Sequence, residues 1–111
     1  MKVLLTGIDG YIGIELGQLL VQRKYNVVGL DTGFYNSGLF YNGIKNLPPI
    51  IWKDIRTIIE KDLESFDAII HLAELSNDPL GQINPQVTYD INHHGTIEMA
   101  KKAKKAGIRK F

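Results

Sequence analysis

The sequence of 111 residues predicts an α/β fold, in which a doubly wound parallel sheet carries helices on both faces. Short apolar runs alternate along the chain with segments of helical period. Glycines stand at positions 7, 10 and 13, where the first apolar run passes into the first helical segment, and Asp31 ends the second apolar run. These observations predict right-handed connections and the strand order 3-2-1-4, with the start of a fifth strand beside the fourth.

The first three elements form one strand–helix–strand unit. Residues 2–6 are a short apolar run, which suits a buried parallel strand. Residues 11–23 repeat apolar side chains at helical spacing, and residues 26–31 form a second apolar run. The apolar stripe expected on this helix consists of Ile12, Leu16, Leu19 and Leu20.

The middle of the chain supplies the third and fourth strands. Residues 32–47 are rich in glycine, asparagine and aromatic residues, so we expect an irregular loop. A short third strand is expected over 49–53, a helix over 56–64 and a fourth strand over 67–73. The helical side chains that should face inward are Ile58, Ile59 and Leu63.

A long helix is expected near the end of the chain. It follows a loop over 74–83 and runs from about 85 to 106. Asn84 suits its N-cap and Pro85 its first turn, whereas Gly107 is a natural stop. Its apolar stripe consists of Val87, Ile91, Met99, Ala103 and Ala106.

The composition argues against several classes of protein. There is no cysteine, which excludes a disulfide framework and a thiolate metal site. His93 and His94 have no partners at ligand spacing, and His71 suits a packed, hydrogen-bonded strand residue, so we expect no metal. Six basic residues crowd residues 101–111, but the last turns of a helix favour cations, so we expect no nucleic-acid partner. Without a signal peptide or a membrane-length apolar segment, the chain is expected to be cytoplasmic.

The glycine-rich turn has the features of a dinucleotide-binding site. Gly7 lets the chain turn sharply out of the strand, Gly10 lets a pyrophosphate approach the backbone, and Gly13 lets the helix pack tightly. The helix N-terminus offers free N–H groups and partial positive charge to phosphates. Asp31 lies near where an acid reaches the ribose hydroxyls, and its charge favours NAD because it would repel a 2′-phosphate. The alternative is a tight turn followed by a solvated loop aspartate.

The sequence resembles the extended short-chain dehydrogenase/reductase superfamily, and within it the NAD-dependent epimerase/dehydratase family that acts on nucleotide sugars. The resemblance covers nearly the whole chain. Its matching pieces are TGIDGYIG at 6–13, Asp31, KDIR at 53–56, DAIIHLAE at 67–74 and DINHHGTIEMAKKAKKAGIRKF at 90–111. It implies that residues 1–111 are the N-terminal part of an NAD(P)-binding Rossmann domain with NAD as cofactor.

The resemblance also implies a set of cofactor-binding residues. Asp54 should contact adenine through its side chain and Ile55 through its backbone, although Asp54 equally suits a helix cap. Leu72 and Ala73 should line the cofactor near its ribose and diphosphate, with strand-end packing as the alternative, and Asn92 should support the site through backbone and water contacts. The full expected set is Gly7, Asp9, Gly10, Tyr11, Ile12, Gly13, Asp31, Asp54, Ile55, Leu72, Ala73, Glu74 and Asn92.

The sequence departs from the family pattern at two positions. Glu74 stands where many relatives have alanine, and Thr57 stands where an aspartate often follows the DIR stretch. Both departures concern local contacts of the cofactor.

The family's catalytic tyrosine and lysine, four positions apart, belong on the helix after the fifth strand, beyond residue 111, so we assign no catalytic residue. Tyr41 and Lys45 have this spacing, but they lie in the loop before the third strand and are rejected. We therefore expect an NAD-binding segment of a nucleotide-sugar epimerase or dehydratase, inactive alone. In the longer enzyme, NAD would transiently oxidise a sugar hydroxyl.

Two alternatives remain open: a standalone NAD-binding or redox-sensing module without chemistry, and a chain that folds but binds nothing. We also expect the fourth strand to present an unpaired apolar edge. Self-association should cover this edge, with residues 108–111 (IRKF) of a partner chain as one candidate.

Overall fold

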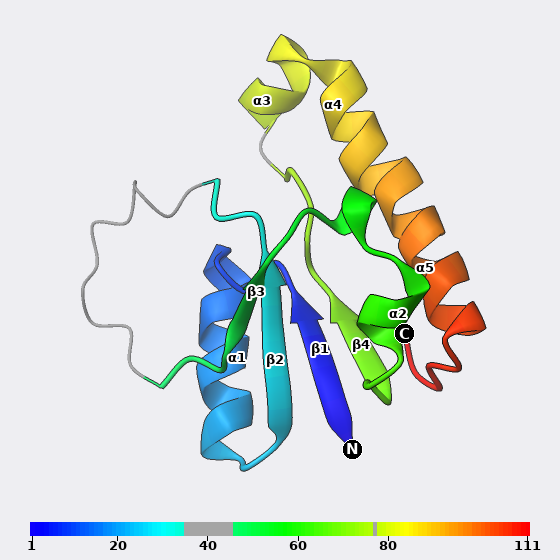
Figure 1. Cartoon of the computed structure of the whole chain (residues 1–111). Coiled ribbons are helices and arrows are strands. Elements are labelled where there is room, and N and C mark those ends of the chain that lie inside the picture. Colours follow the sequence, from blue (N-terminus) through cyan, green and yellow to red (C-terminus); the bar gives the residue numbers. More distant parts are fainter. Residues whose placement is uncertain (35–45, 77) are drawn as a thin grey trace.

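The computed structural model describes residues 1–34, 46–76 and 78–111. Its core is a four-stranded parallel sheet with the order β3-β2-β1-β4, as predicted (Figure 1). The strands, with the helix that joins the first two, are β1 (Lys2–Thr6), α1 (Tyr11–Gln22), β2 (Asn26–Asp31), β3 (Ile50–Trp52) and β4 (Ala68–His71). The predicted bounds of the first two strands are therefore confirmed.

The sheet separates two hydrophobic cores, because alternate strand residues point to opposite faces. One face packs with α1 and uses Val3, Leu5, Val27 and Ala68. The other face packs with the C-terminal helices and uses Leu4, Leu30 and Ile69. Figure 1 shows α1 and α5 on opposite sides of the sheet, which confirms the doubly wound arrangement.

Helix α1 meets the sheet through a face that the hydrophobic pattern did not predict. Ile12 is 63% exposed and Leu19 is 45% exposed, so the expected stripe is wrong at both positions. The buried residues of α1 are Gly13, Ile14 and Gly17, and Leu16 and Leu20 pack beside them. The two glycines have no side chain to hold the helix away from the neighbouring backbone, and this closeness sets which face turns inward.

Ile8 lies in the turn between β1 and α1 and anchors this turn in the core beneath α1. Its side chain is fully buried. A Cβ on Gly17 of α1 would lie 2.4 Å from Ile8 Cδ1, and a Cβ on Gly29 of β2 would lie 2.8 Å from Ile8 Cγ1. Both glycines therefore make room for a single isoleucine between the helix and the sheet.

The segment after β3 is less helical than the sequence predicts. It forms the 3-10 turn η2 (Ile55–Thr57) and the short helix α2 (Glu60–Leu63). Ile58 and Leu63 are buried as predicted, but Ile59 is 55% exposed. Ile58 and Ile59 have extended backbones, since consecutive β-branched residues disfavour a helix. Helix α2 then begins as a separate helix, and the Asp62 carboxylate caps it by accepting the Ile59 N–H at 2.9 Å.

The C-terminal helical region contains more structure than expected. Its elements are α3 (Asp78–Ile83), α4 (Pro85–Tyr89), the π-helix η3 (Asp90–Gly95) and α5 (Thr96–Lys105). The loop expected over 74–83 is therefore wrong at α3, where Pro79 suits a first helical turn. Helices α3 and α4 extend beyond the carboxyl ends of the strands (Figure 1).

The signals that delimit the long helix are confirmed. The Asn84 side chain accepts the Val87 N–H at 3.2 Å, and Gly107 ends the helix with a φ of +79°. Within the stripe, Ile91, Met99 and Ala103 are buried, and Val87 and Ala106 pack against the same core. The π-helix was not expected. Among the described residues no helix has both the length and the apolar character that crossing a membrane requires.

The free edge of β4 is covered in part by the chain itself. Lys110 pairs with Ala68 in a parallel bridge, and the Ile69 N–H donates to the Lys110 carbonyl at 2.9 Å. The Arg109 N–H donates to the Asp67 carbonyl at 3.1 Å. The expectation of an unpaired edge is therefore wrong at these residues, because Lys110 of the IRKF segment bridges to β4 within the same chain. Self-association stays a prediction.

We predict that Ile8→Ala lowers the free energy of unfolding by about 2–5 kcal/mol, because it leaves a cavity between two glycines. Urea unfolding monitored by circular dichroism measures the change. Ile12→Ala is the matched control, since its side chain is mostly exposed, and it should change stability by no more than about 0.5 kcal/mol. Equal losses of unfolding free energy in the two variants would contradict the packing role of Ile8.

Candidate cofactor site

A hollow opens at the carboxyl ends of β1, β2 and β4, where parallel α/β sheets place their ligands. Its volume, with the open mouth included, is about 610 Å³. Its walls come from the turn after β1, the end of β2, the segment after β3, the loop after β4 and η3. The lining residues are Gly7, Asp9, Gly10, Leu30, Asp31, Thr32, Phe34, Lys53, Asp54, Ile55, Leu72, Ala73, Glu74, Leu75 and Ile91.

The turn after β1 forms the floor of this hollow. Gly7 has a φ of +72°, and its N–H donates to the Leu30 carbonyl at 2.8 Å. A Cβ on Gly7 would lie 2.7 Å from the backbone carbonyl carbon and oxygen of Leu72. The left-handed conformation and the contact both require glycine here. The turn and the loop after β4 consequently touch backbone to backbone.

Gly13 lets the first turn of α1 lie on the strand-to-helix turn. A Cβ at this position would lie 1.9 Å from the Gly7 carbonyl oxygen. Gly10 is less constrained, because its Cβ would lie 3.2 Å from the same oxygen. Gly13 is therefore a packing glycine, whereas Gly10 lines the hollow and keeps its surface bare.

The N-terminus of α1 has no side-chain cap. Gly10 occupies the N-cap position with an extended backbone, and the first turn contains no acidic residue. The side chains of Tyr11 and Ile12 are 92% and 63% exposed, and neither they nor Gly13 lines the hollow. What these positions offer is the first-turn backbone, whose N–H groups have no partner within the helix.

Two carboxylates face each other across the same floor. Asp31 accepts the Asp9 N–H and the Gly33 N–H, each at 3.0 Å. The Oδ2 atom of Asp9 is buried and has no hydrogen-bond partner among the described residues. Burial raises the pKa of Asp9, and the charge of Asp31 raises it further. The floor thus combines a bare helix end with two acceptor side chains.

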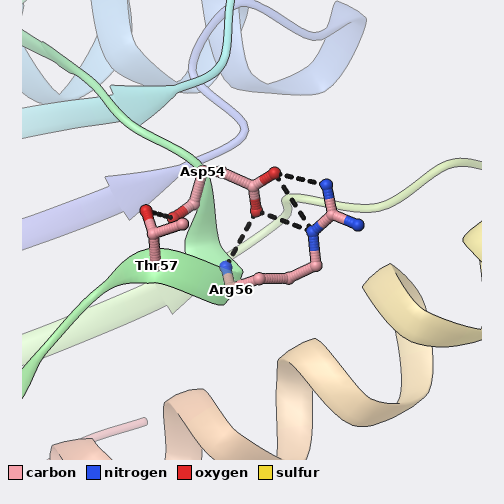
Figure 2. A network of polar contacts seen from close by, with 3 residues as sticks. All are labelled: Asp54, Arg56 and Thr57. Atoms are coloured by element: carbon pink, nitrogen blue, oxygen red, sulfur yellow. Dashed lines mark hydrogen bonds and ion pairs between the residues drawn. The ribbon is translucent and has the colours of Figure 1, made fainter.

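Asp54 lies on the wall beside η2, and Arg56 binds its carboxylate in a fork (Figure 2). The Arg56 Nη2 atom lies 2.6 Å from the Asp54 Oδ2 atom, and the Arg56 backbone N–H donates to Asp54 Oδ1 at 2.8 Å. These interactions, the side-chain hydrogen bond first, hold the pKa of Asp54 below its ordinary value. The helix-cap interpretation of Asp54 is confirmed for a single 3-10 turn. The Thr57 hydroxyl closes this turn by donating to the Asp54 carbonyl at 2.9 Å.

The loop after β4 is held by two side chains from outside it. The buried Thr6 hydroxyl oxygen accepts the N–H groups of Leu72 and Ala73 at 3.1 and 3.2 Å. Asn92, on the π-helix, accepts the Leu75 N–H at 2.8 Å and donates to its carbonyl at 3.0 Å. Asn92 supports the wall in this way without lining the hollow.

His71 is packed and hydrogen-bonded, as the sequence predicts. Its Nδ1 lies 2.8 Å from the Thr6 hydroxyl and its Nε2 lies 3.0 Å from the Thr96 hydroxyl. His93 and His94 are exposed; the His93 ring stacks on Tyr89, and the His94 ring meets Tyr89 edge-on. The structure, where it is described, brings together no group of three or more histidine, cysteine, aspartate or glutamate side chains suited to a metal. Tyr41 and Lys45 lie outside the described residues.

Six lining residues were missed from the sequence: Leu30, Thr32, Phe34, Lys53, Leu75 and Ile91. Lys53 had a usable signal, since it follows β3 directly, at the carboxyl edge of the sheet. Its N–H donates to the Asp31 carbonyl at 2.8 Å, and its ammonium binds Asp62 at 2.5 Å. Ile91 had none, because its place on the stripe of the long helix predicted only a core residue.

The sequence profile of the NAD dependent epimerase/dehydratase family matches residues 3–111. The chain belongs to this family. The family's description names NAD, the cofactor that the sequence predicts. The fold and the position of the hollow agree with this assignment.

Known proteins of the family show the same relationship. The chain is 30% identical to a UDP-glucose 4-epimerase of Klebsiella pneumoniae, over all of this chain and 86% of that protein. It is 31% identical to a UDP-glucose 4-epimerase of Streptomyces lividans, over 99% of this chain and 34% of that one. The solved UDP-glucose-4-epimerase of Stenotrophomonas maltophila, with bound NAD and formylated UDP-arabinopyranose, superposes with a TM-score of 0.79 at 25% identity. This match covers 97% of the present chain and 34% of that structure.

We predict that Gly13→Ala destabilises the fold by about 2 kcal/mol or more, because the new methyl group would overlap the Gly7 carbonyl. Gly10→Ala should cost about 1 kcal/mol, since its methyl group needs only a small adjustment at a helix N-cap. Thermal and urea unfolding compare the two. A larger loss for Gly10→Ala would contradict the division of roles between these glycines.

The Asp54 carboxylate predicts a pH dependence of stability. Because its pKa is lowered in the folded chain, its contribution is present above the ordinary value of 3.8 and is lost as pH falls through the lower folded value. We expect Asp54→Asn to cost less than about 1 kcal/mol at pH 7 and to flatten the loss of stability below pH 4. Glu98→Gln removes the more exposed pair with Lys101 and should flatten the curve less. Superimposable curves for wild type and Asp54→Asn would refute this contribution.

Proposed function

We propose that this chain binds NAD, with the diphosphate resting on the turn between β1 and α1. The observation that carries the proposal is the bare, uncapped N-terminus of α1 beside the hollow. An anion placed there would accept N–H groups that have no partner within the helix and would face the positive end of its dipole. Gly10, which lines the hollow, leaves no side chain in the way.

The acidic residues of the floor fit the ribose of adenosine. Asp31 lies at the end of β2 and points toward the turn, where it accepts the Asp9 N–H. The Oδ2 atom of Asp9 is a buried acceptor that a hydroxyl donor would satisfy. Two carboxylates at this point oppose an additional phosphate, which supports NAD rather than NADP.

The remaining walls suit the adenine and the second half of the dinucleotide. Ile55 is buried behind Asp54, and both residues line the hollow on the side of β3. Leu72 and Ala73 line the opposite side, where they touch the glycine turn through their backbones. We assign the first pair to adenine and the second pair to the ribose and diphosphate, with Asn92 holding the adjacent loop in place.

We also propose that the chain is part of a longer protein with the chemistry of a nucleotide-sugar epimerase or dehydratase. NAD, when bound, supplies reversible acceptance of a hydride from a sugar carbon. The support for a larger catalytic unit is that this chain covers only about a third of the length of two known relatives. Residues 1–111 would be the N-terminal, cofactor-binding part of its Rossmann domain. In this sequence, only Tyr41 and Lys45 have the Tyr-x-x-x-Lys spacing, and they precede the third strand rather than follow the fifth. We therefore propose that the 111 residues bind the cofactor without turnover.

We predict that isothermal titration calorimetry detects NAD binding and that NADP binds at least about tenfold more weakly. Asp31→Asn keeps an oxygen acceptor but removes the charge, so it should weaken NAD binding and narrow the gap to NADP. Glu15→Ala, at an exposed acid of α1, is the control and should leave both affinities unchanged. Absence of NAD binding, or equal binding of the two cofactors by the wild type, would overturn the proposal.

A further inference from the structure

A chain of hydrogen bonds runs beneath the wall of the hollow, from β1 through β4 to α5. It links the Thr6 hydroxyl, the His71 ring and the Thr96 hydroxyl, with distances of 2.8 and 3.0 Å at the two ring nitrogens. At one end the Thr6 oxygen receives the N–H groups of Leu72 and Ala73, which form the wall. No role assigned so far to the site uses this histidine.

The partners fix the direction of every bond in the chain. The Thr6 oxygen accepts two backbone N–H groups, so its own hydrogen is free to point to Nδ1 of His71. The Thr96 hydroxyl donates to the Asn92 carbonyl at 2.7 Å, so its oxygen accepts from Nε2 of the ring. The contacts are satisfied together only by a neutral ring that carries its proton on Nε2.

We propose that His71 is a positioning residue of the cofactor site, which in its neutral Nε2–H form orients the Thr6 hydroxyl to hold the backbone of Leu72 and Ala73. The link to the cofactor rests on the proposed function, since these two residues matter to NAD only if NAD occupies the hollow. A shift of Leu72 would reach the floor directly, because its carbonyl oxygen lies only 2.7 Å from the position that a Cβ on Gly7 would take.

Protonation of His71 would break this arrangement. A charged ring donates from Nδ1, which would turn the Thr6 hydrogen away and toward the two N–H groups that its oxygen now accepts. Burial holds the pKa of His71 below its ordinary value of 6.5, and the carboxylate of Glu74 opposes this in part. Glu74 is the charged side chain whose field acts on the ring; Thr6 of β1, Thr96 of α5 and the stacked ring of Phe111 are uncharged. The hydrogen bonds from the Leu72 and Ala73 N–H groups to the Thr6 hydroxyl should therefore be present at pH 8 and weaken as pH falls below 6.5.

Two substitutions separate the hydrogen bond from simple packing. His71→Asn places an amide oxygen where Nδ1 accepts, and this group does not titrate. His71→Phe keeps an aromatic ring but removes the acceptor. We expect His71→Phe to raise the Kd for NAD by about threefold to tenfold at pH 8, and His71→Asn to stay close to wild type. His94→Asn, at an exposed histidine of η3, is the matched control.

The pH profile is the readout that a purely structural histidine would not change. As pH falls from 8 through the lowered pKa of His71, the affinity of wild type and His94→Asn for NAD should fall, whereas that of His71→Asn should stay nearly level. Amide hydrogen exchange without NAD should show faster exchange at Ala73 in His71→Phe only, because the Leu72 N–H also donates to the Thr6 carbonyl at 3.2 Å. Ring nitrogen NMR of the wild type should place the proton on Nε2.

The outcomes distinguish this proposal from the proposed function. If wild type binds no NAD at pH 8, the proposed function fails, and the exchange rates and ring NMR still decide whether His71 holds the wall. A proton on Nδ1, or unchanged exchange at Ala73 in His71→Phe, would overturn the proposal. So would an unchanged pH profile in His71→Asn, and this variant keeps the test decisive if His71→Phe does not fold.

Discussion

The structure depends on a close approach of three backbones around Gly7. The first turn of α1 lies against one side of this residue, where Gly13 leaves no space for even a methyl group. The loop after β4 lies against it too, since a Cβ on Gly7 would lie 2.7 Å from the Leu72 carbonyl. Side chains cannot enter these contacts, so the strand, the helix and the loop are fixed relative to one another by main-chain atoms.

This constraint produces the site as a consequence of the packing. Once the helix is drawn onto the turn, its uncapped end and the bare surface of Gly10 face the hollow. Ile8 anchors the turn from below, between Gly17 and Gly29. The acidic side chains then act on a rigid frame, because Asp31 is tied to the same turn through the Asp9 N–H. Packing and ligand recognition thus share one short segment.

The sequence predicts the parts of the fold that depend on local signals. The strands β1 and β2 are bounded by glycine and by an acid, and the C-terminal helical region starts at Asn84 and stops at Gly107. The hydrophobic pattern does not predict contacts that depend on glycine. On α1, Gly13 and Gly17 determine which face of the helix packs on the sheet. The π-helix and the exposed Ile59 also escape prediction, because the tertiary contacts of Asn92 and the capping by Asp62 outweigh helical periodicity.

The candidate site is predictable to a similar degree. Its glycines and Asp31 follow from motif spacing, whereas Leu75 and Ile91 enter the lining only through tertiary packing. The central claim, that the turn between β1 and α1 receives the diphosphate, is tested most directly by titrating the ¹⁵N-labelled chain with NAD and following its amide signals. The account predicts that the largest shifts occur at residues 10–13, in the first turn of α1. Shifts confined to other parts of the chain, with this turn unaffected, would contradict it.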